Sequence, residues 1–163
     1  MLAAKAALIG GLTLAAGTIA VLGSMLAGCL ILPGHGFTQA HGYLPLSLGS
    51  GPDLRAAAGS VLYLALIAPL ALGVATIVRD SAVATGAVLA LLYLVPIVAS
   101  VVSNATWHRR LDQLSPMTAG LYIQVTAGLR SLPLTPWQGL GVLAAWAVGA
   151  LTLAALLLVF RDA

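Results

Sequence analysis

Two long stretches without charged residues, 56–78 and 81–103, constrain this chain more than any other feature of its sequence. As a helix, each stretch is long enough to cross a hydrocarbon layer about 30 Å thick, at about 1.5 Å per residue. The charged pair between them, Arg79 and Asp80, falls at the connection, where water or lipid headgroups can solvate it. Within a span, each charge would cost about 2.5–3.5 kcal/mol. The pattern predicts two membrane helices joined at a membrane surface.

Two further stretches, 6–32 and 137–160, are also uncharged and mostly apolar. The composition agrees, because only 7% of the residues are charged and the mean hydropathy is +1.07, whereas a soluble domain carries about 25% charged residues. The sequence therefore predicts an all-α polytopic membrane helical bundle with four transmembrane helices. All of it belongs to a single transmembrane domain, residues 1–163, and four spans place both termini on one side of the membrane.

The connections 33–55 and 104–136 hold most of the polar residues. In the second connection, Pro116 can open a short helix with an apolar residue at every fourth position. These residues are Met117, Leu121, Val125 and Leu129. A stripe of this kind suits a helix that lies in the membrane interface or dips shallowly into it. We therefore predict a short interfacial helix before the last span.

Small residues four positions apart predict where the membrane helices approach one another closely. Such ridges are formed by Ala82, Gly86 and Ala90, by Gly141, Ala145 and Gly149, and by Ser24 and Gly28. Pro69 and Pro96 lie inside the second and third spans, where a proline removes a helical hydrogen bond and favours a kink. A kink of this kind can belong to a transport path or be a packing irregularity.

The residue inventory argues against enzymatic chemistry. The sequence has no phosphate-binding loop, no paired carboxylates and no nucleophile placed beside a base. His35 and His41 lie six residues apart without further ligands nearby, so we interpret them as loop imidazoles. No catalytic, cofactor-binding or metal-ligating residue is predicted. The basic residues are scattered along the chain, which argues against nucleic acid as a partner.

Cys29 is the single cysteine and allows two interpretations. The sequence Leu26-Ala27-Gly28-Cys29 resembles the lipobox of bacterial lipoproteins, in which the cysteine is acylated. However, the apolar run before Cys29 is longer than the roughly 7–15 residues of a signal-peptide core, and it continues beyond the cysteine. We expect a membrane helix here and keep acylation of Cys29 as the alternative.

Six segments of the sequence are similar to those of a known family: residues 59–63, 72–84, 91–96, 116–121, 136–141 and 161–163. Together they resemble the ABC-2 type permeases of actinobacterial ATP-binding-cassette exporters, and the resemblance covers essentially the whole chain. Such permeases commonly have six spans. By this resemblance residues 1–5 align with the entry to the third span, so the first two spans are lacking.

The resemblance implies a permease subunit that forms a substrate path in the bacterial plasma membrane. Its partners would be separate ATP-hydrolysing subunits and a second permease subunit, as a homodimer or heterodimer. Lys5, the Arg79-Asp80 pair and residues 161–162 would lie in the cytoplasm, with 33–55 and 104–136 outside. The alternatives are a small structural or assembly membrane protein, including a lipoprotein, or a non-functional C-terminal fragment of a permease.

Overall fold

The structure is a computed structural model that describes residues 2–32, 51–126, 129 and 132–161. Within these ranges the chain forms helices and turns, and no strand. The helices are α1 (Leu2–Ile31), α2 (Gly51–Val78), α3 (Ser81–Val101), α4 (Ala105–Leu114), α5 (Pro116–Leu121) and α6 (Pro136–Arg161), and a 3₁₀ turn, η3 (Tyr122–Gln124), follows α5.

Among the described residues, four helices are long and apolar enough to cross a membrane: α1, α2, α3 and α6. This confirms the predicted all-α membrane bundle with four spans. The predicted ranges 6–32, 81–103 and 137–160 agree closely with the observed helices. The second span differs, because α2 begins at Gly51 rather than at residue 56. Pro52 and Asp53 are favourable in a first helical turn. The backbone N–H that proline lacks would have no partner within the helix there, and the Asp53 carboxylate lies at the positive end of the helix dipole.

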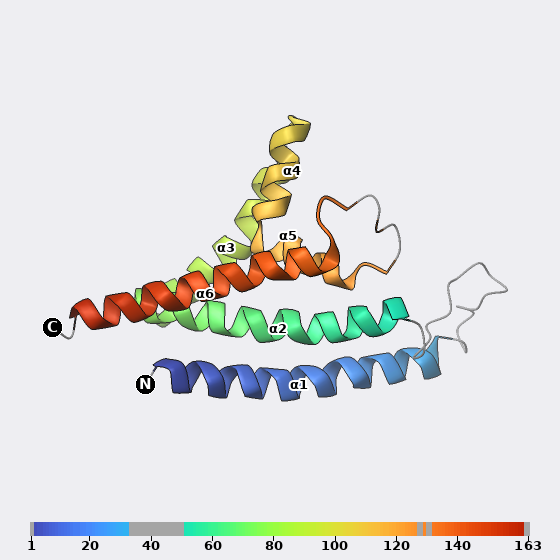
Figure 1. The fold of residues 1–163 in the computed structure, drawn as a ribbon, viewed down its shortest axis with the longest axis horizontal. Coiled ribbons are helices and arrows are strands. Elements are labelled where there is room, and N and C mark those ends of the chain that lie inside the picture. The colour runs from blue at the N-terminus through green and yellow to red at the C-terminus, as the bar shows by residue number, and fades with distance from the viewer. Residues whose placement is uncertain (1, 33–50, 127–128, 130–131, 162–163) are drawn as a thin grey trace.

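Three of the long helices, α1, α2 and α6, lie side by side as one layer (Figure 1). α2 is in the middle of this layer and packs against both neighbours. The start of α1, the end of α6 and the turn between α2 and α3 lie at the same end of the bundle. α3 leaves the layer at a steep angle, and α4 returns from its far end, roughly perpendicular to the layer helices.

The contact between α2 and α6 forms the core of the bundle. Leu70 and Leu143 are fully buried there, with Tyr63 and Ala147 beside them. At Gly73 the two backbones come close, since an added Cβ would lie 2.8 Å from the carbonyl carbon of Ala150. Apolar side chains gain little by leaving lipid, so close packing between small residues is what holds membrane helices together.

The predicted small-residue ridges of α3 and α6 are wrong for contacts within this chain. An added Cβ at Gly86, Gly141 or Gly149 would meet no atom within 4 Å. On α6 the buried positions are instead Leu140, Leu143, Ala147 and Ala154. The spacing of small residues therefore did not predict the face of α6 that makes the contact.

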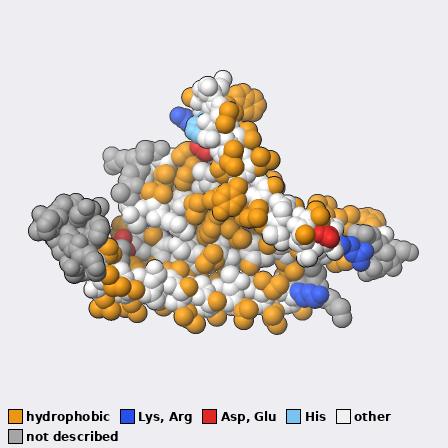
Figure 2. Space-filling model, turned by 180° about the vertical axis from the view of Figure 1, so that it is seen from behind, with side chains coloured by type: hydrophobic (Ala, Val, Ile, Leu, Met, Phe, Trp, Pro, Cys, Tyr) orange, Lys and Arg blue, Asp and Glu red, His pale blue; other side chains and the backbone are white. Residues whose placement is uncertain are grey.

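α1 packs mainly against α2 and leaves most of its surface open. Leu8, Leu12, Ile19 and Leu30 are all largely exposed. Hydrophobic side chains are likewise spread over the face of the bundle that Figure 2 shows. An apolar surface of this extent is what a helix presents to lipid.

Several serine and threonine hydroxyl groups within the spans are bonded inside their own helices. Thr13, Ser60, Thr76 and Thr85 each donate a hydrogen bond of 2.7–2.8 Å to the carbonyl of the residue four positions earlier. In hydrocarbon no water can serve as a partner, so this local bonding removes the cost of burying a hydroxyl. α2 and α3 also continue as helices through Pro69 and Pro96.

The Arg79-Asp80 pair ends one span and starts the next. Arg79 has a positive φ of 62°, and its backbone N–H donates to the Ala75 carbonyl at 3.0 Å. The Asp80 carboxylate accepts a hydrogen bond from the backbone N–H of Val83 at 2.8 Å and caps α3. Both residues thus have structural roles in a tight helical turn.

The Gly73 contact predicts opposite effects for one substitution at two glycines. Gly73→Ala forces the α2 and α6 backbones apart and should lower the free energy of unfolding by about 1–3 kcal/mol. In Gly149→Ala the added methyl group meets open space. This substitution should leave the free energy of unfolding unchanged or raise it by up to about 1 kcal/mol, because alanine favours helix. Unfolding in mixed detergent micelles measures both, and equal effects would contradict the proposed contact.

The left-handed conformation of Arg79 predicts that glycine is the better residue there. A non-glycine residue in this conformation costs about 1–2 kcal/mol, so Arg79→Gly should raise the free energy of unfolding. Arg79→Ala removes the same charge but keeps the backbone strain, so it serves as the control. If both variants unfold at the same denaturant concentration, strain at this turn does not limit stability.

Candidate functional site

The short helix that the sequence predicts before the last span exists, but it is buried. α5 begins at Pro116 as predicted and ends at Leu121, where η3 follows. The predicted stripe that includes Val125 and Leu129 therefore does not run along one helix. Ala119 and Ile123 are fully buried, and the segment packs against α2 and α6. α5 thus exists as the predicted short helix, and it packs against the core of the bundle.

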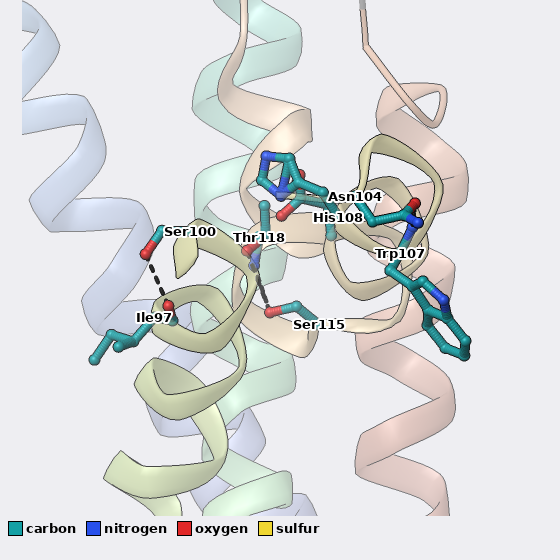
Figure 3. Close-up of polar contacts among 8 residues, drawn as sticks. Ile97, Ser100, Asn104, Trp107, His108, Ser115 and Thr118 are labelled. Carbon is teal, nitrogen blue, oxygen red and sulfur yellow. Dashed lines mark hydrogen bonds and ion pairs between the residues drawn. The ribbon is translucent and has the colours of Figure 1, made fainter. Parts of the chain in front are cut away.

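Ser115 turns the chain from α4 into α5. Its hydroxyl oxygen accepts hydrogen bonds from the Thr118 backbone N–H at 3.3 Å and from the Thr118 hydroxyl at 3.2 Å (Figure 3). Pro116 follows in the first helical turn, where no backbone donor is needed. Ser115 is only 1% exposed, so this cap satisfies a buried helix end from within the segment itself.

Glycines make room for α5 and η3 between the long helices. An added Cβ at Gly59 of α2 would overlap the Ile123 side chain, and one at Gly139 of α6 would overlap the Ala119 carbonyl. From the other side, Gly120 lies against the ring of Tyr63. The segment is therefore held tightly between α2 and α6, and a larger residue at any of these glycines would displace it.

Arg55 ties the start of α2 to the end of this segment. Its Nη2 donates a 2.8 Å hydrogen bond to the carbonyl of Val125. Its Nε atom is buried and has no hydrogen-bond partner among the described residues. The sequence analysis placed Arg55 in an external connection, whereas the structure places it inside α2 with a structural contact. The bonded residues lie 70 positions apart, so no local pattern indicates the contact.

α4 is the amphipathic helix that the sequence analysis missed. The Asn104 side-chain oxygen caps it by accepting hydrogen bonds from the backbone N–H groups of Thr106 at 3.0 Å and Trp107 at 3.4 Å. The side chains of Trp107 and His108 leave α4 on different sides (Figure 3). Trp107, Leu111 and Leu114 share one face, because they follow the i, i+4, i+7 pattern. An N-cap followed by this pattern is the signal that could have identified α4.

The charged groups of α4 interact weakly with one another. His108 Nδ1 lies 3.9 Å from the Asp112 carboxylate, and the Arg110 guanidinium lies 5.9 Å from the centre of the Trp107 ring. Burial raises the pKa of the Tyr122 hydroxyl above its ordinary value, and the negative charge of Asp112 raises it further. Tyr122 therefore remains a neutral phenol near pH 7.

Two histidines discussed from the sequence, His35 and His41, lie outside the described residues, as does most of the connection 33–55. Cys29 is half-buried in the last turn of α1, which runs on to Ile31. Within the described part of the chain, no three His, Cys, Asp or Glu side chains lie close enough to hold a metal ion.

Two of the grooves on the surface of the bundle are lined entirely by described residues. The first, which we term the α1–α2 groove, has a volume of about 620 Å³. It is lined by Ala20, Val21, Ser24, Met25, Gly28, Leu32, Asp53, Ala56, Ala57, Ser60, Gln124 and Thr126. Five of these residues are polar or charged, so the groove combines an apolar wall with hydrogen-bonding groups. It suits an amphipathic molecule.

The second groove, the α3 groove, lies between α2, α3 and α6 and has a volume of about 600 Å³. It is lined by Val74, Ile77, Leu91, Leu114, Val142, Ala145, Trp146, Gly149, Ala150 and Leu153. The only polar side-chain atom in this lining is the indole nitrogen of Trp146, which donates to the Leu114 carbonyl at 3.0 Å. This groove suits a purely apolar occupant.

Comparison of the sequence and the fold with protein-family profiles, curated proteins and solved structures finds no match. The functional interpretation therefore depends on the bundle itself. It offers two grooves of different polarity, a buried segment before the last span and an amphipathic helix beside it.

The hydrogen bond from Arg55 predicts a local effect on η3. Arg55→Met keeps the length of the side chain but removes a charged hydrogen bond that is typically worth about 1.5–3 kcal/mol. Hydrogen exchange at the Val125 amide, which donates to the Tyr122 carbonyl, should become faster while exchange in α6 is unchanged. Arg109→Met, at an exposed arginine of α4, is the control and should leave Val125 unchanged. Unchanged exchange in Arg55→Met would show that the contact does not hold η3.

Proposed function

We propose that this chain is the membrane-spanning permease subunit of an ATP-binding-cassette exporter of the ABC-2 type. In this role it lines a substrate path and is driven by separate ATPase subunits in the plasma membrane. The resemblance of its apolar segments to such permeases supports the proposal. The end of the bundle that holds the start of α1, the turn at Arg79 and the end of α6 then faces the cytoplasm and the ATPases.

The α1–α2 groove is the observation that carries the proposal. Its walls offer apolar surface from Ala56 and Val21 together with polar groups such as Ser60 and Gln124. A path with this mixture receives amphipathic compounds without covalent chemistry, because the apolar wall binds the body of the compound and the polar groups orient its head. The groove lies against η3, so movement of the wedged α5–η3 segment would change its shape.

The side chains of the spans support ATP hydrolysis as the source of energy. Residues 6–32, 56–78, 81–103 and 137–160 contain no acidic, basic or histidine side chain, and Asp53 and Arg55 lie in the first turns of α2. Ion-coupled transporters use such groups inside the membrane to carry the coupling ion. ATP hydrolysis on a partner subunit supplies the energy without them, which favours an exporter subunit over a secondary transporter.

The proposal predicts an ATPase partner. The tagged chain, extracted from its native membrane in mild detergent, should co-purify with an ATP-binding-cassette ATPase, and the complex should hydrolyse ATP in lipid nanodiscs. Mass spectrometry of the purified complex identifies the partner. Repeated purification without any ATPase would contradict the proposal.

A pair of groove variants tests the path within that complex. Ala57→Trp fills the α1–α2 groove and should abolish the stimulation of ATP hydrolysis by transported compounds while the complex still assembles. Leu22→Trp adds a similar volume to an exposed position of α1 and should leave the stimulation unchanged. If the two variants show the same stimulation of ATP hydrolysis, the substrate path does not run through the α1–α2 groove.

A further inference from the structure

The α3 groove has the length of one membrane leaflet. Along α6 it runs from Val142 to Leu153, which is roughly 16 Å at 1.5 Å per residue. The hydrocarbon core of a bilayer is about 30 Å thick, so this length covers about half of it. All but one of the lining residues belong to membrane spans, the exception being Leu114 at the end of α4. The groove therefore opens to lipid rather than to water.

Only an apolar molecule fits the walls of this groove. The indole N–H of Trp146 is already bonded to the Leu114 carbonyl, so no lining side chain offers a free hydrogen-bonding group. A water molecule in a cavity needs two to four polar partners and is not stable there. The surrounding medium supplies acyl chains, whose apolar surface matches these walls.

α4 places charge beside the groove. Charged side chains gather on the flank of α4 that is turned away from the end holding the chain termini, and hydrophobic side chains cover the opposite flank (Figure 2). An interfacial helix has this orientation when its apolar face rests on the hydrocarbon and its polar face meets the headgroups. The Leu114 end of α4 forms part of the groove wall, so the charged residues in the turn before Leu114 lie within about one helical turn of the groove.

Arg110 is the cation nearest to this wall along the helix. It precedes Leu114 by four residues, about one helical turn, and lies at the border between the apolar face of α4 and its charged flank. Its guanidinium also lies over the Trp107 ring at 5.9 Å, and both side chains are exposed. α4 has two arginines and one aspartate, and the carboxylate of Asp112 lies 3.9 Å from His108. The exposed guanidinium is thus open to an anion from outside the chain.

We propose that the α3 groove and α4 together bind one anionic phospholipid. One acyl chain lies in the groove against Trp146, and the headgroup phosphate pairs with the Arg110 guanidinium. Arginine binds phosphate oxygens with two parallel hydrogen bonds, and Trp107 lies at the boundary between headgroup and acyl chain, where tryptophan is favoured. The bound lipid fills the angle between α3 and the layer of α2 and α6. The site does not depend on the proposed transport function.

Quenching of Trp146 by brominated lipids tests this site directly. The protein has three tryptophans, so Trp107→Phe with Trp137→Phe leaves Trp146 as the only one. The variant is reconstituted with phosphatidylglycerol or phosphatidylcholine that carry identical brominated acyl chains. Phosphatidylglycerol should reach half-maximal quenching at a mole fraction roughly fivefold lower, the preference that one basic residue near an anionic headgroup provides. Equal quenching by the two lipids would overturn the proposal.

Matched variants separate the site from general charge and packing effects. Arg110→Gln should abolish the preference for phosphatidylglycerol, whereas Arg109→Gln, which removes the same charge from α4, should retain it. Gly149→Leu fills the groove and should weaken quenching by both lipids, whereas Gly141→Leu, also in open space, should not. Equal loss in the two arginine variants would overturn the proposal. For the unaltered chain, native mass spectrometry should detect retained phosphatidylglycerol that is lost in Arg110→Gln, and its absence from the unaltered chain would also overturn the proposal.

Discussion

The close approach of α2 and α6 is the contact on which the rest of the bundle depends. Where Gly73 meets Ala150, the two backbones leave no room for an added Cβ, and Leu70 and Leu143 are buried beside this contact. α5 and η3 fit against the same two helices, while α1 adds to the free side of α2. Because lipid provides no hydrophobic drive between spans, the packing of these small residues determines the arrangement of the other elements.

Polar groups in this bundle follow two different rules according to their depth. Within the spans, hydroxyl groups bond to their own helix, as Thr76 does to the Leu72 carbonyl. Near the end of the bundle where α2 begins and α5 is packed, polar side chains reach distant segments instead. Arg55 bonds to Val125, and the Gln113 side-chain amide donates to the Pro133 carbonyl at 3.1 Å. The local bonds satisfy hydroxyl groups without a partner from another helix, and the long-range bonds hold the segments between the spans in place.

The elements that the sequence predicts well are those determined by composition over a long window. The charge-free runs predict the four spans and the turn at Arg79, because the hydrocarbon layer imposes length and polarity on each span separately. The packing faces could not be predicted, since many small residues share the spacing of Gly141 and Gly149. The contact of Arg55 and the burial of α5 depend on residues far away in the chain. α4 could have been predicted from the Asn104 N-cap and the apolar pattern that follows it. The sequence analysis instead placed the apolar stripe on the helix that begins at Pro116.

The order of the helices along the chain has a consequence for assembly during synthesis. α1 and α2 precede the other described helices along the chain and touch each other, so this helical hairpin can form as soon as both have entered the membrane. α2 packs as extensively against α6, which follows the other described helices along the chain. Until α6 is inserted, Tyr63 and Leu70 lack the surface that buries them, and α5 has only one wall. The core therefore closes late, and chains that stop before residue 136 keep the most constrained face of α2 open to lipid.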